Sequence, residues 1–139
     1  MKLAIVGSRN ITRVNIEEHI SNDVTEIVSG GALGVDTLAK GFAKEHGIKF
    51  TEFLPEYNIY GKAAPIKRNQ RIAEYADASL VFWNGSSKGT EHTIKFFKDL
   101  KKPVKVIVIE FKFWSGRPDR QMSMFVQTKF VCAYHDDEV

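Results

Sequence analysis

The chain has 139 residues, of which 43% are hydrophobic and 27% charged, as is typical of one globular domain with its own core. Its formal net charge of +3 suits a phosphate-bearing small ligand but is too small to require a nucleic-acid partner. One cysteine, Cys132, excludes an internal disulfide framework, and no apolar run approaches the roughly 20 residues of a membrane span, so we expect a cytoplasmic protein without a membrane partner.

Strand-like and helix-like segments alternate along most of the chain. The periodicity of apolar residues predicts helices over 35–46, 66–76 and 90–100, and a short first helix near 12–20 capped by Thr12 or Asn15. Apolar or alternating runs rich in β-branched residues predict strands over 2–6, 26–29, 48–54, 79–83 and 104–109.

This alternation predicts an α/β fold, because short connections between strand, helix and strand imply right-handed crossovers. We expect a Rossmann-like three-layer α/β/α sandwich with a five-stranded, mostly parallel sheet over residues 1–110. The segment 111–139 is a C-terminal extension, which could form an extra hairpin, cover a sheet edge or make a dimer contact. We favour an extension whose aromatic residues pack on the same domain.

Three glycine-bearing turns follow predicted strands: Gly7-Ser8-Arg9, then 30–34, then 85–90. The carboxyl ends of parallel strands meet at one edge of a sheet, so we expect the three turns to converge there. Glycines let backbone N–H groups approach a phosphate, and a helix beginning near Thr90 directs its partial positive charge to the same place.

Several side chains could complete an anion site at this edge. Arg9 and Arg68 could each pair with a phosphate, whereas Arg71 fits a solvated helix face. Asp36 could cap its helix or hold a ribose hydroxyl. The candidate phosphate- or ligand-binding residues are Gly7, Ser8, Arg9, Gly30, Gly31, Gly34, Asp36, Arg68, Gly85, Ser86, Gly89 and Thr90.

Other polar and aromatic residues are ambiguous. Glu91 and His92 could act in acid–base chemistry or belong to an ordinary helix start. Tyr57 and Tyr60, in a segment that periodicity does not assign, could stack on a base or pack against the core. No metal-ligand spacing occurs, and we expect no metal and no cofactor.

The ordered motifs 5–9, 29–39, 67–73 and 85–90 resemble the SLOG superfamily, and most closely its YspA-like group. The second and third motifs also resemble DprA/Smf DNA-processing proteins, and the last two resemble Lonely Guy phosphoribohydrolases. The resemblance covers about residues 2–110. It implies a Rossmann-like domain, often a homodimer, that binds a nucleotide or a nucleotide-derived ligand.

The Lonely Guy resemblance implies a catalytic role for Arg68 and phosphate binding by Gly89 and Thr90. Those enzymes place a catalytic glutamate three residues after the threonine, where this chain has Thr93. Glu91 is displaced from that position by two residues, which is about 200 degrees around a helix.

Three functions stay open at this point. The first is binding of a nucleotide-derived ligand, such as an ADP-ribose-like or cyclic nucleotide signal. The alternative is an N-glycosidic hydrolase acting on nucleoside monophosphates, with Arg68 and Glu91 as catalytic residues. The third is single-stranded nucleic-acid binding, as in DprA, for which the modest charge is a weaker basis.

Overall fold

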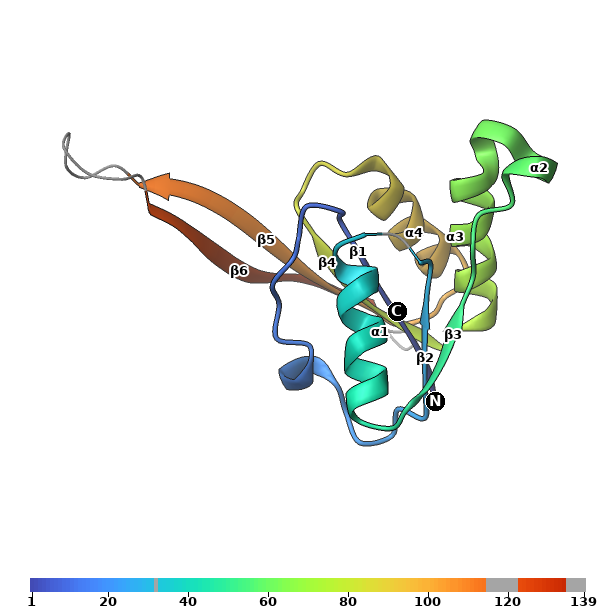
Figure 1. Ribbon diagram of the computed structural model, residues 1–139, viewed down its shortest axis with the longest axis horizontal. Coiled ribbons are helices and arrows are strands. Elements are labelled where there is room, and N and C mark those ends of the chain that lie inside the picture. Colours follow the sequence, from blue (N-terminus) through green and yellow to red (C-terminus); the bar gives the residue numbers. More distant parts are fainter. Residues whose placement is uncertain (32, 115–122, 135–139) are drawn as a thin grey trace.

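A computed structural model of the protein describes residues 1–31, 33–114 and 123–134. Its centre is a six-stranded sheet with the order β3-β2-β1-β4-β5-β6 (Figure 1). The first five strands of that order are parallel, and β6 is antiparallel to β5. The strands are β1 (Lys2–Gly7), β2 (Glu26–Ser29), β3 (Lys49–Glu52), β4 (Ala78–Trp83), β5 (Val104–Trp114) and β6 (Ser123–Tyr134).

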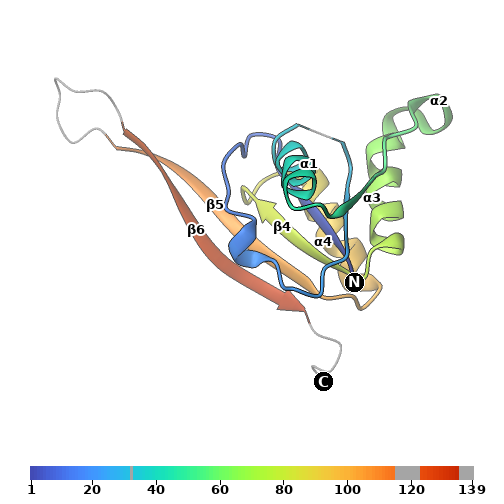
Figure 2. The same cartoon turned by 60° about the horizontal axis from the view of Figure 1, so that its bottom comes forward.

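Helices cover both faces of the sheet, which confirms the expected Rossmann-like sandwich (Figures 1 and 2). One face packs against α1 (Val35–Glu45), and the opposite face packs against α3 (Ala64–Tyr75) and α4 (Lys88–Asp99). Within the part of the chain that the structure describes, no helix combines the length and the apolar character that crossing a membrane requires.

The apolar runs of the central strands supply both cores. In β1, Ile5 belongs to the cluster under α1, and its neighbour Val6 belongs to the cluster under α3 and α4. In β4, Phe82 belongs to the cluster under α1, and Val81 belongs to the cluster under α3 and α4. Successive side chains of a strand point to opposite faces, so a strand covered on both sides must be apolar throughout.

The predicted first helix does not form. Residues 11–16 are irregular, and only a short 3₁₀ turn, Glu17–His19, follows them. Asn15 does not cap this turn but donates a hydrogen bond to Glu18 Oε2 at 3.4 Å. Ile11 and Ile16 are buried in the cluster under α1, so the segment covers the sheet without the helix that its spacing suggested.

α1 begins at Val35 as predicted, and the two later helices begin two residues earlier than predicted. α3 begins at Ala64, with Pro65 in its first turn, and α4 begins at Lys88, with Ser87 as its N-cap. The unassigned segment forms a one-turn helix, α2 (Tyr57–Tyr60), followed by a 3₁₀ turn, η2 (Gly61–Ala63).

The C-terminal segment forms a hairpin. β5 runs on to Trp114, well past its last pairing with β4 at Val108, and pairs there with β6 alone. The two strands extend beyond the rest of the sheet (Figures 1 and 2). Of the three alternatives for 111–139, the described backbone therefore forms the hairpin. The predicted packing of its aromatic side chains lies outside the described residues.

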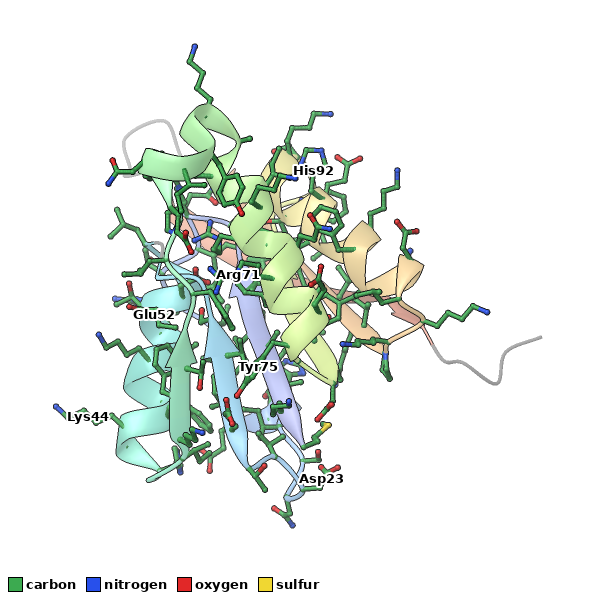
Figure 3. All side chains as sticks on the ribbon, turned by 90° about the vertical axis from the view of Figure 1, so that its right-hand side faces the viewer. Asp23, Lys44, Glu52, Arg71, Tyr75 and His92 are labelled. Atoms are coloured by element: carbon green, nitrogen blue, oxygen red, sulfur yellow. The ribbon has the colours of Figure 1, made fainter. Side chains whose placement is uncertain are left out.

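A buried carboxylate, that of Glu26 at the amino end of β2, joins this strand to β3 and to α3. Glu26 Oε2 accepts hydrogen bonds from Thr51 Oγ1 at 2.6 Å and from the Tyr75 hydroxyl at 2.5 Å. Lys49 Nζ lies 3.6 Å from the other carboxylate oxygen. The hydrogen bonds from Thr51 and Tyr75, together with the charge of Lys49, lower the pKa of Glu26. Tyr75 reaches this carboxylate from α3 (Figure 3).

We predict that Glu26→Gln lowers the free energy of unfolding by about 1–2 kcal/mol at pH 7. A folded pKa below the unfolded value of about 4.3 stabilises the protein above that pH, and this stability is lost as the pH falls through the folded pKa. In urea unfolding, the difference in free energy of unfolding between wild type and Glu26→Gln should therefore shrink as the pH falls from 6 to 3. The exposed Glu52 supplies the control, Glu52→Gln. A deficit that is the same at every pH would contradict the prediction.

Candidate functional site

A cavity of about 430 Å³ opens at the carboxyl edge of the sheet, between the ends of β1 and β4. Chain connections run outward from these two strands in opposite directions, because β1 leads to β2 and β3 on one side and β4 leads to β5 on the other. Ligands of open α/β sheets bind where the strand order reverses in this way. The lining residues are Val6, Gly7, Ser8, Arg9, Asn10, Gly30, Asp36, Pro65, Arg68, Asn69, Ile72, Asn84, Ser87, Gly89, Thr90 and Thr93.

The structure brings most of the sequence-predicted residues to this cavity, from all three glycine-bearing turns, from α1 and from α3. Those that line it are Gly7, Ser8, Arg9, Gly30, Asp36, Arg68, Gly89 and Thr90. Those that do not are Gly31, Gly34, Gly85, Ser86 and Glu91.

The turn between β4 and α4 is shaped by its own side chains. Asn84 Oδ1 accepts hydrogen bonds from the backbone N–H groups of Ser86 at 2.9 Å and Ser87 at 2.8 Å. Ser87 Oγ then caps α4 by accepting from the Thr90 N–H at 3.5 Å and from Thr90 Oγ1 at 3.1 Å. Between Ser87 and Thr90, the backbone N–H groups of Lys88 and Gly89 make no hydrogen bond within the described residues, as is usual for a first helical turn.

This turn is tied directly to the turn after β1. The Asn84 N–H donates to Ser8 Oγ at 3.1 Å, and Asn84 Nδ2 donates to Asn10 Oδ1 at 3.2 Å. Ser8 is almost fully buried, with 2% of its surface exposed. The floor of the cavity is therefore held by side-chain hydrogen bonds between two strand ends.

Arg68 lines the cavity from α3 and is fixed at two points. Its Nη1 donates to the carbonyl of Gly30, and its Nε donates to Asn69 Oδ1 at 2.8 Å. A Cβ atom at Gly30 would lie 2.7 Å from Arg68 Nη1, so only glycine lets the guanidinium lie this close to the loop. Nη2 makes no hydrogen bond to any described residue, which leaves donors for a ligand.

Burial lowers the pKa of Arg68, the nearby side chains of Asp36 and Tyr57 raise it, and the guanidinium of Arg9 lowers it again. An arginine keeps its proton in proteins, so the lowered pKa means that a positive charge is held with less hydration than in water. An anion in the cavity would compensate for that loss.

Asn69 connects the arginine with the third turn. Besides accepting from Arg68, it donates from Nδ2 to the carbonyl of Gly89 at 3.4 Å, and only 8% of it is exposed. It thereby positions the first turn of α4 relative to α3.

The glycines outside the cavity have a different role. At Gly34 the backbone has φ = 79°, and a Cβ atom there would lie 2.5 Å from the carbonyl oxygen of Arg9. The second turn can therefore pack on the first only with glycine at this position. Gly34 shapes the edge of the sheet and does not face the cavity.

Glu91, predicted as a catalytic residue, lies outside the cavity. Its side chain is 55% exposed and lies 3.9 Å from Lys88 Nζ on the surface of α4. Thr93 lines the cavity in its place, with its hydroxyl donating to the Gly89 carbonyl at 3.1 Å. The helical displacement noted from the sequence accounts for this. His92 also lies on the exposed side of α4 (Figure 3).

Sequence reasoning missed several lining residues. Asn84 follows a predicted strand directly and precedes a glycine, which is a recognisable turn signal. Asn69 stands next to Arg68 in the helix, but nothing in the sequence shows that it bridges two elements. Among the described residues, no group of histidine, cysteine and acidic side chains could hold a metal ion.

The cavity thus combines cationic and neutral donors with one carboxylate. Arg9, Arg68 and the first turn of α4 favour a negatively charged group. Asp36, which is 6% exposed, can accept a hydrogen bond from a hydroxyl. A ligand with both an anionic group and hydroxyl groups fits this set.

Comparison with known proteins does not assign a family. A scan against protein-family models finds no model that matches the chain, and a search of curated proteins finds no match.

We predict that Gly34→Ala lowers the free energy of unfolding by about 1–3 kcal/mol, because it combines backbone strain with a steric clash. The control is Gly41→Ala in α1, where an added Cβ meets nothing within 4 Å. That change should leave the protein as stable or up to about 1 kcal/mol more stable. Thermal unfolding compares the two variants. Equal melting temperatures would show that the close packing of the two turns does not constrain the fold.

Proposed function

We propose that the protein binds a nucleotide or a nucleotide-derived ligand, with a phosphate group at the first turn of α4 and beside Arg68. One observation carries the proposal: the half-buried guanidinium of Arg68 and the N-terminus of α4 line the same cavity. A helix N-terminus and a bidentate arginine both bind phosphate groups in proteins. Arg9, on the exposed rim, adds a second cation.

The size and the remaining polar groups of the cavity support a nucleotide. A volume of about 430 Å³ lies within the range of pockets for small ligands, roughly 300–1,000 Å³. Asp36 supplies an acceptor for a sugar hydroxyl. Inorganic phosphate alone would use neither the volume nor this carboxylate.

The resemblance to the SLOG superfamily and its YspA-like group is part of the proposal. It is supported by the strand order β3-β2-β1-β4-β5 and by the motifs that converge on the cavity. We place the function in the cytoplasm, because a single cysteine suits a reducing compartment. From the resemblance we also propose that the protein forms a homodimer. The hydrolase alternative relied on Glu91, which lies outside the cavity, so binding is the function we propose.

We predict that Arg68→Ala weakens binding of adenosine 5′-monophosphate or ADP-ribose roughly 10- to 150-fold, because a charge-assisted contact contributes about 1.5–3 kcal/mol. Isothermal titration calorimetry measures this change. Arg71→Ala is the matched control: Arg71 lies on the same helix, pairs with Glu56 at 2.6 Å and does not line the cavity. Its affinity should stay within about twofold of wild type. Wild-type protein that binds neither ligand at millimolar concentration would overturn the proposal.

We predict that Gly89→Ala separates binding from folding. Gly89 lines the cavity in the first turn of α4, and an added Cβ meets nothing within 4 Å. The free energy of unfolding should stay the same or rise by up to about 1 kcal/mol, since alanine favours a helix. The added methyl group should hinder a phosphate at the helix N-terminus and weaken binding about tenfold or more. Unchanged affinity would place the phosphate elsewhere.

A further inference from the structure

A cluster of exposed apolar side chains lies between β3 and α3. Leu54, Tyr57, Ile59, Tyr60 and Ile66 are 56%, 56%, 67%, 42% and 39% exposed, and we call them the α2 surface. Single exposed apolar residues are ordinary, whereas five of them on one short stretch of chain, 54–66, mark a candidate binding surface. The fold as described does not need these side chains for its core.

The α2 surface borders the cavity. The short helix α2 stands at the carboxyl edge of the sheet, just beyond the first turn of α3 (Figures 1 and 3). That first turn supplies Pro65 and Arg68 to the cavity lining. Tyr57 is near enough to Arg68 to contribute to the pKa of the guanidinium.

Tyr57 is the aromatic ring best placed to accept a ligand. The ring of Tyr60 already has the ammonium group of Lys67 5.9 Å from its centroid. Among the described residues, no ring and no cation stacks on Tyr57, and more than half of its surface is exposed. Arg68 lines the cavity together with Gly89 and Thr90 of α4. The short helix that carries Tyr57 therefore stands next to the side of the cavity that α3 forms (Figure 1).

We propose that Tyr57 stacks on the base of the bound ligand while the phosphate of that ligand lies at α4 and Arg68. The inference rests on the proposed function and narrows it: the ligand class is a nucleotide that retains its base, rather than a sugar phosphate. Every base has an aromatic face that a tyrosine can cover. The base of the bound ligand then covers part of the exposed α2 surface.

The test compares adenosine 5′-monophosphate with ribose 5-phosphate, which has the same phosphate and sugar but no base. Calorimetry on the full chain should show that wild type binds the nucleotide about tenfold more tightly or better, as stacking on one aromatic side chain predicts. Tyr57→Ala should weaken binding of the nucleotide but not of ribose 5-phosphate, so that the two affinities become similar. Tyr57→Phe should retain the preference, since it keeps the ring. Ile59→Ala, the matched control on the same short helix, should retain it as well.

The other outcomes are also decisive. Equal affinities of wild type for the two ligands would overturn the role of Tyr57 but leave the phosphate site intact. If neither ligand bound, the proposed function and this inference would both be wrong. If Tyr57→Ala and Ile59→Ala both converted a dimer into monomers in sedimentation experiments and left the ligand preference unchanged, the α2 surface would be a contact between two copies of the chain.

Discussion

The guanidinium of Arg68 lies directly against the backbone of Gly30, and this contact joins the two sides of the candidate site. It connects α3 with the loop that precedes α1, across the carboxyl ends of the sheet. Asn69 extends the connection to the first turn of α4. A change in any of these elements would therefore move the arginine relative to the helix N-terminus. The geometry for an anion thus depends on backbone packing as much as on charge.

The glycines of the three turns divide into two groups. Gly30 and Gly34 allow close approach between parts of the protein, to Arg68 and to the carbonyl of Arg9. A Cβ atom at Gly89 would meet nothing within 4 Å, and this glycine opens onto the cavity. A glycine-rich turn is therefore only partly a ligand-binding feature. Part of it exists because adjacent turns must fit together at one edge of the sheet.

The sandwich could be predicted from the sequence because its strands are short, apolar and regularly separated by helical periodicity. The edge of the site could be predicted for the same reason, since parallel strands must end together. The spacing of apolar residues wrongly predicted a first helix, because Ile11 and Ile16 are buried by irregular backbone instead. Contacts such as Asn69 with Gly89 and Asn84 with Ser8 depend on side-chain geometry between distant elements, for which the sequence carries no local signal.

The hydrogen bond between Ser8 and Asn84 spans 76 positions of the chain. During synthesis on the ribosome, the first turn of the site emerges long before the turn that completes it. β1, the strand that leads to Ser8, must wait for β4 before it has both neighbours in the sheet. A nascent chain that ends before α4 can hold the first two glycine-bearing turns but lacks the helix N-terminus that lines the cavity. The candidate site is therefore completed only after β4 and the start of α4 have been synthesised.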